Sequence, residues 1–125
     1  DLIMLDIKHI NDDKHISLTG LSNKNVLDFA EYISEKGVDL SVRHVVVQGW
    51  TSDSSDLYEL GKFIGKLKSL KSIDPLAYHT LGIHKYTELN IPYPLNGVPQ
   101  TTKEQLIEAK YSILKGIKET RNKGD

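Results

Sequence analysis

Hydrophobic and polar positions along the chain indicate three strands, each followed by a helix. The strands are predicted where apolar and β-branched residues run together, at residues 2–7, 40–47 and about 72–78. Pro75 falls inside the third strand, and proline cannot donate a hydrogen bond to a sheet ladder. We therefore expect the third strand to lie at an open edge of the sheet.

Helical spacing of apolar residues predicts a helix at about residues 22–37 and a second helix after Asp53, a candidate N-cap. Gly61 and Gly65 lie four residues apart in the second helix and would permit close packing of another element. The third helix has two alternative capping boxes at its start, Thr101 with Glu104 or Thr102 with Gln105. Residues 11–19 are predicted to be a polar connection, and the proline-containing segment 86–100 a functional or partner-facing loop.

This alternation is typical of an α/β fold with right-handed parallel crossovers. Three strands are too few to close a barrel, so we expect the first strand to have further neighbours on its N-terminal side. The chain opens at Asp1 directly in a strand and without a methionine, which we interpret as a piece of a longer protein. The pattern alone predicts a single domain that is a fragment of a β/α barrel.

Composition narrows the possible functions. A net charge of -1 argues against a nucleic-acid binder, and the apolar runs are too short to cross a membrane. We see no signal peptide, so we expect a cytoplasmic protein. The chain contains no cysteine, which excludes disulfides, zinc–thiolate sites and an iron–sulfur cluster held by these residues alone.

Charged side chains stand near the ends of the predicted strands, where β/α barrels bind their ligands. Alternation places Met4, Asp6 and Lys8 on one face of the first strand. Arg43 lies on one face of the second strand, and His79 follows the third. A carboxylate, an ammonium, a guanidinium and an imidazole in one place would suit a zwitterionic or anionic small molecule.

Structural roles are the alternatives for each of these residues. Asp6 and Lys8 could pair with each other, Arg43 could pair with a helix acid, and His79 could be a hydrogen-bonded structural residue. The spacing of the other histidines, His9, His15, His44 and His84, forms no transition-metal pattern.

Four segments resemble the pyruvate formate-lyase activating enzyme family of glycyl-radical activases, in the order and spacing of that family. They are residues 1–8 (DLIMLDIK), 43–51 (RHVVVQGWT), 78–86 (YHTLGIHKY) and 91–99 (IPYPLNGVP). The resemblance implies the C-terminal three β/α units of an open, six-unit TIM-like barrel across residues 1–125. The N-terminal half of that barrel, with the cluster-binding CxxxCxxC motif, would be absent.

The resemblance further implies a radical S-adenosylmethionine oxidoreductase of anaerobic metabolism. With S-adenosylmethionine and a 4Fe-4S cluster, such an enzyme generates a glycyl radical on pyruvate formate-lyase, its partner, and takes electrons from a flavodoxin-like or other low-potential donor. Asp6, Lys8, Arg43 and His79 would bind the cofactor, and Asp6 with the Met4 carbonyl would hold a monovalent cation. The resemblance assigns no catalytic residue within this chain, which we expect to be inactive alone.

Two other hypotheses about the function remain open at this point. The chain could be a docking module that binds a partner through residues 86–100, or an unrelated barrel enzyme with Lys8 as a Schiff-base amine. In any of these cases an exposed first strand and an apolar inner face would favour self-association of the fragment.

Overall fold

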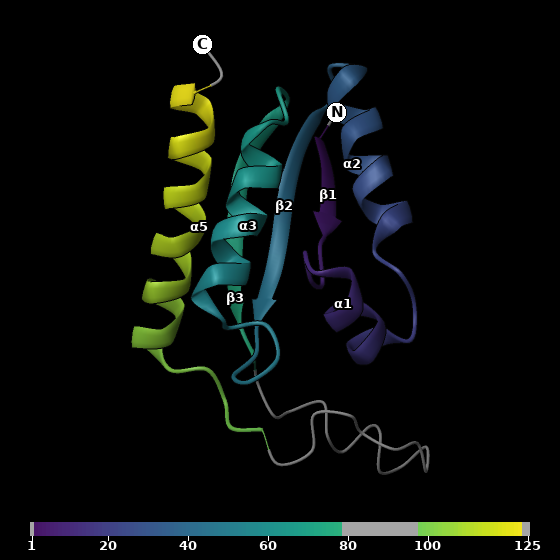
Figure 1. Cartoon of the computed structure of the whole chain (residues 1–125). Helices are drawn as coiled ribbons and strands as arrows, with labels where there is room; N and C mark the ends of the chain where they lie inside the picture. Colours follow the sequence, from purple (N-terminus) through teal and green to yellow (C-terminus); the bar gives the residue numbers. More distant parts are fainter. Residues whose placement is uncertain (1, 79–97, 124–125) are drawn as a thin grey trace.

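A three-stranded parallel sheet with helices packed on one side forms the described part of the chain (Figure 1). The structure is a computed structural model and describes residues 2–78 and 98–123. The strands are β1 (Leu2–Asp6), β2 (Asp39–Val46) and β3 (Leu70–Ala77), in the order β1-β2-β3. Both pairs are parallel, so the predicted α/β class with a parallel sheet is confirmed. That the sheet is part of a barrel stays a prediction.

In residues 2–78 and 98–123, four helices accompany the sheet. They are α1 (Asp12–Thr19), α2 (Lys24–Glu35), α3 (Ser54–Gly65) and α5 (Lys103–Lys123). Figure 1 shows α3 in front of the sheet, with α2 to its right beside β1 and α5 to its left. In residues 2–78 and 98–123, no helix combines the length and the apolar character needed to span a bilayer.

Helix α1 corrects the prediction that residues 11–19 are an irregular connection. The Asn11 side chain accepts a hydrogen bond from the Lys14 backbone N–H at 3.0 Å, and Gly20 ends the helix in a left-handed conformation with φ 83°. Its single buried residue is His15, so it lacks the apolar stripe by which an amphipathic helix is recognised. The caps at Asn11 and Gly20 mark the two ends of this helix, and a prediction from the hydrophobic pattern does not take such caps into account.

The core lies between the helices and one face of the sheet. Its strand residues include Ile3, Leu5, Leu40, Val42, Val46 and Ile73, and all three of α2, α3 and α5 contribute to it. The residues that alternate with these on the strands have no helix over them. We call this side of the sheet the uncovered face: Leu2, Met4 and Asp6 of β1, Asp39, Ser41, Arg43 and Val45 of β2, and Ser72, Asp74 and Leu76 of β3. Leu2 and Met4 are each 55% exposed there.

The predicted helix caps are found at α3 and α5. Asp53 accepts hydrogen bonds from the backbone N–H groups of Ser55 and Asp56 at 2.8 and 3.2 Å. At α5 the second of the two alternatives forms, since Thr102 and Gln105 each bind the other's backbone N–H with the side chain. Thr101 instead accepts from the Tyr78 N–H and donates to the Val46 carbonyl, which fastens the start of α5 to the ends of β2 and β3.

Close packing at the predicted glycines is confirmed, and the element that packs there is α5. A Cβ atom on Gly61 would overlap the carbonyl oxygen of Ile113, and one on Gly116 would overlap that of Tyr58. The β3 strand, which contains Pro75, stands at one end of the strand order, as its proline predicts. Residues 79–97 lie outside the described residues, and with them most of the predicted partner-facing loop.

Candidate functional site

A charged row crosses the uncovered face near the carboxyl ends of the strands. Asp6 of β1 is in register with Arg43 of β2, and Arg43 is in register with Asp74 of β3. Arg43 donates from Nε to Asp6 Oδ1 at 2.7 Å and from a terminal nitrogen to Asp6 Oδ2 at 3.2 Å. This two-point pairing orients both side chains, and it differs from both structural pairings that the sequence suggested for them. Asp6 pairs with Arg43 rather than with Lys8, and the acid that holds Arg43 comes from a strand rather than from a helix.

The Asp6–Arg43 pair is open to solvent, with side chains that are 42% and 39% exposed. Exposed ion pairs contribute about 0–1 kcal/mol, because water screens the charges and both side chains lose conformational freedom. The pair therefore stabilises the fold little and can separate at small cost when another charged group binds.

The other three predicted site residues, Met4, Lys8 and His79, differ in where the structure places them. Met4 lies on the uncovered face one row before Asp6 and is exposed. Lys8 is also exposed, just beyond the end of β1, whereas a Schiff-base lysine is normally activated by desolvation in an apolar pocket. His79 lies outside the described residues. The structure thus brings Met4, Asp6 and Arg43 onto one face, and their roles toward a ligand stay predictions.

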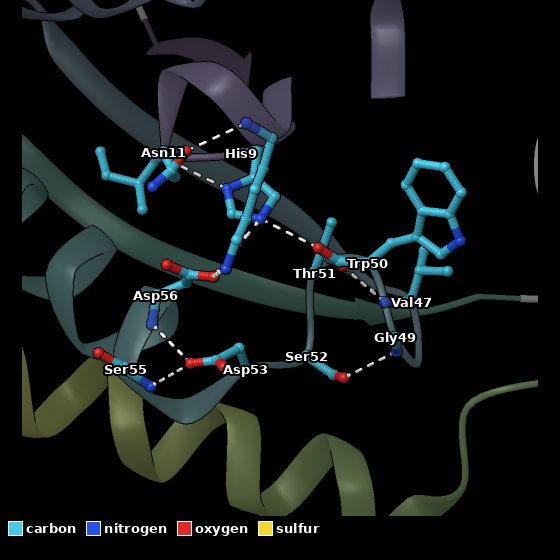
Figure 2. Close-up of polar contacts among 12 residues, drawn as sticks. His9, Asn11, Val47, Gly49, Trp50, Thr51, Ser52, Asp53, Ser55 and Asp56 are labelled. Carbon is cyan, nitrogen blue, oxygen red and sulfur yellow. Dashed lines mark hydrogen bonds and ion pairs between the residues drawn. The ribbon is translucent and has the colours of Figure 1, made fainter. Parts of the chain in front are cut away.

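On the opposite side of the sheet, two buried histidines hold the loop that follows β2, and Figure 2 shows the contacts of one of them, His9. His9 is 2% exposed, and its Nε2 lies 3.0 Å from the backbone carbonyl oxygen of Trp50. Its Nδ1 accepts from the Asn11 backbone N–H at 3.1 Å, so the proton is assigned to Nε2, which donates to Trp50. Figure 2 shows the Trp50 indole ring extending away from His9. His9 thus joins the end of β1, the start of α1 and the β2–α3 loop.

A second buried histidine strengthens the same junction. His44 Nδ1 lies 2.7 Å from the Ile7 carbonyl oxygen, and the nearby Thr51 hydroxyl donates to the Val45 carbonyl at 2.7 Å. Burial lowers the pKa of both His9 and His44, although the Asp56 carboxylate near His9 acts against this shift. Both rings are therefore neutral at physiological pH and act as hydrogen-bonding residues.

The contacts around Asp56 connect α1 to α3. Lys14 Nζ lies 2.5 Å from Asp56 Oδ2, and His9 Nε2 lies 3.7 Å from the same oxygen. An open pocket of about 340 Å³ lies next to this junction, lined by Lys14, Ser17, Gly49, Trp50, Ser52 and Asp53. Neither Asp6 nor Arg43 lines this pocket, so it is separate from the charged row.

Sequence reasoning missed the roles of His9 and His44 because each contacts backbone groups about 40 residues away in the chain. It also missed Asp74, for which alternation from Ser72 was an available signal. In the part of the chain that the structure describes, no three His, Asp or Glu side chains are grouped as metal ligands.

Comparison with known proteins identifies several pyruvate formate-lyase-activating enzymes as relatives. The chain is 46% identical over 110 residues to the pyruvate formate-lyase-activating enzyme of Streptococcus mutans, a match that covers 88% of the chain and 42% of the relative. It is 42% identical over 114 residues to the enzyme of the same name from Listeria monocytogenes, covering 91% of the chain and 46% of the relative. The chain therefore spans less than half the length of the curated relatives it matches. No family model matches it.

A solved structure shares the fold. The crystal structure of a domain of pyruvate-formate lyase-activating enzyme from Bacteroides vulgatus superposes with a TM-score of 0.72, over 92% of this chain and 62% of that one. The sequence identity is 15%, so this comparison speaks for the fold alone. The sequence comparisons show that the chain is similar to one part of the pyruvate formate-lyase-activating enzymes of these organisms.

Proposed function

We propose that the chain is one part of an enzyme that generates a glycyl radical on pyruvate formate-lyase. The observation that carries this proposal is the identity of 42–46% with pyruvate formate-lyase-activating enzymes over about nine-tenths of the chain. When bound, S-adenosylmethionine and a 4Fe-4S cluster would supply the chemistry that removes a hydrogen atom from a backbone glycine of the partner. The residues of this chain would bind and orient the first of these cofactors.

The side chains on and beside the uncovered face fit a zwitterionic cofactor. Asp6 offers a carboxylate to a positively charged group, while Arg43 and Lys8 offer cations to a carboxylate. Met4, exposed in the adjoining row, adds an apolar surface. In this proposal Asp6, Lys8 and Arg43 hold the methionine part of the cofactor, together with His79 from outside the described residues.

The Asp6–Arg43 pair must open for this binding, because Arg43 contacts both oxygens of the Asp6 carboxylate. The cost is at most about 1 kcal/mol for a pair this exposed, which is small beside the affinity of a micromolar ligand, about 8 kcal/mol. A monovalent cation at Asp6 and the Met4 carbonyl would have to displace Arg43 in the same way.

The cluster must be held by other residues. Iron–sulfur clusters are bound by cysteine thiolates, and this chain contains no cysteine. The proposal therefore requires that the CxxxCxxC motif and the remaining strands of an open six-unit barrel come from sequence other than these 125 residues. It also includes a low-potential electron donor of the flavodoxin type and a cytoplasmic setting.

The experiment is glycyl-radical formation by the full-length protein under anaerobic conditions, with pyruvate formate-lyase, S-adenosylmethionine and a reductant. Electron paramagnetic resonance measures the radical, and the visible absorbance of the cluster measures cofactor loading. We expect Asp6→Ala and His79→Ala to lower the radical yield at least tenfold with unchanged cluster loading. Asp39→Ala, which removes an exposed carboxylate at the start of β2, is the matched control. Unchanged radical yield in Asp6→Ala would contradict the site, and no radical with the wild-type protein would contradict the function.

A further inference from the structure

Asp74 is the charged residue in the row of Asp6 and Arg43 to which the proposed site gives no role. It stands opposite Arg43 in the β2–β3 register, as Asp6 stands opposite Arg43 in the β1–β2 register. A single guanidinium therefore lies in one row between two carboxylates that come from the two outer strands. Only the Asp6 side of this row is paired in the structure.

The adjoining row shows that side chains can meet across β2 and β3. Ser41 and Ser72 are in register two residues before Arg43 and Asp74, and their hydroxyl oxygens are 2.6 Å apart. Rows two residues apart lie on the same face of a sheet. Since two short serine side chains touch across this strand pair, the longer side chains of Arg43 and Asp74 can also reach each other.

Arg43 has donors to spare for a second carboxylate. A guanidinium carries five N–H groups, and the contacts to Asp6 employ Nε and one terminal nitrogen. Asp74 is exposed and forms no side-chain hydrogen bond or ion pair with another residue in 2–78 or 98–123. Both possible pairs would be exposed pairs of about 0–1 kcal/mol, so neither is strongly preferred.

We propose that Asp74 is a positioning residue that accepts the Arg43 guanidinium when a positively charged ligand group takes Asp6. The exchange frees the Asp6 carboxylate without leaving Arg43 unpaired, and so lowers the cost of opening the Asp6–Arg43 pair. The identity of the ligand group, the ammonium of S-adenosylmethionine, rests on the proposed function. The exchange of Arg43 between two carboxylates does not.

A double-mutant cycle in the full-length protein tests the exchange without any cofactor. Arg43→Gln, Asp74→Asn and their combination are made with Asp6 present and again in the Asp6→Asn background, and unfolding by urea is measured. With Asp6 present we expect the coupling between Arg43 and Asp74 to change the unfolding constant less than about twofold. In the Asp6→Asn background we expect about two- to fivefold, because Arg43 then pairs with Asp74. Equal coupling in the two backgrounds, or none in either, overturns the exchange.

Calorimetric titration with S-adenosylmethionine tests its consequence for the ligand. We expect Asp74→Asn to raise the Kd about three- to tenfold, Asp74→Glu to restore it to within twofold, and Asp39→Asn to leave it unchanged. A wild-type Kd retained in Asp74→Asn overturns the positioning role. If the wild-type protein does not bind the cofactor at all, the proposed function fails, and the double-mutant cycle still decides whether Arg43 exchanges. Far-ultraviolet circular dichroism shows that each variant is folded.

Discussion

The contact between α3 and α5 allows a sharp test of the packing. Gly61 is the position where the two helix backbones come together, since a Cβ there would overlap the Ile113 carbonyl oxygen and lie 2.9 Å from the carbonyl carbon. The same Cβ would lie 3.1 Å from the Cα of Gly116. All three atoms belong to the backbone, so no rotamer change relieves the overlap in Gly61→Ala. The helix α5 must move away as a unit.

The magnitude follows from two opposing effects. Alanine is favoured over glycine within a helix by about 1 kcal/mol. Overpacking of a close contact costs about 1–3 kcal/mol, and we place Gly61→Ala at or above the upper end because the displaced group is a helix backbone that carries the buried Ile113. We therefore expect a net loss of about 2 kcal/mol in the free energy of unfolding.

Gly65→Ala is the matched control one turn later in the same helix. Its Cβ would lie 3.0 Å from the Ile117 Cα and 3.2 Å from the Ile117 carbonyl oxygen, an overlap of a few tenths of an ångström. The gain in helix propensity roughly offsets this cost, so the net change should stay within about 1 kcal/mol.

Thermal and urea unfolding followed by circular dichroism measure both variants. For a domain of this size, 1 kcal/mol corresponds to about 3–6 °C in Tm. Gly61→Ala should therefore unfold about 6–12 °C below the wild type. A Gly61→Ala protein as stable as Gly65→Ala would refute the close approach of α3 and α5.

Three further predictions concern stability and association. Because burial lowers the pKa of His9 and His44, the unfolded chain binds protons at a higher pH than the folded chain, and the free energy of unfolding should fall as the pH drops below about 6.5. His9→Gln should reduce the slope of this free energy against pH in urea unfolding, and an unchanged slope would contradict the lowered pKa of His9. Thr101→Val removes hydrogen bonds to Val46 and Tyr78 and should lower the free energy of unfolding by about 1–3 kcal/mol. The capping variant Thr102→Ala should lower it by about 1 kcal/mol, and a larger loss in Thr102→Ala than in Thr101→Val in urea unfolding would contradict this prediction. The exposed Leu2, Met4 and Leu76 should make the 125-residue chain self-associate, and a clean monomer at high concentration in sedimentation would reject this.

Periodicity and capping chemistry predicted much of the fold because their causes are local. The strands were located to within two residues, Pro75 indicated an edge strand, and the side chains of Asp53 and Thr102 cap the helices that they precede. The spacing of Gly61 and Gly65 predicted a close approach, but only the structure shows that α5 and Gly116 stand opposite. Such a partner is set by tertiary packing, which local spacing does not contain.

The candidate site was predictable to a similar degree. Strand alternation placed Met4 and Asp6 on one face and separated Arg43 from His44, as the structure shows. Alternation could not choose between Lys8 and Arg43 as the partner of Asp6, because that choice depends on the β1–β2 register. The His9 contact to Trp50 could not be predicted from the sequence for the same reason, since it joins two loops that lie close together only once the sheet has assembled.

The most direct test of the proposed site is hydrogen–deuterium exchange of the full-length protein with and without S-adenosylmethionine. The account predicts slower exchange in peptides that contain residues 4–8 and 41–47, which carry Asp6, Lys8 and Arg43. Exchange in residues 24–36, which hold α2 on the other side of the sheet, should not change. Protection confined to the helices, or no protection of the β1 and β2 peptides by a cofactor that binds, would contradict the claim that the uncovered face is the cofactor site.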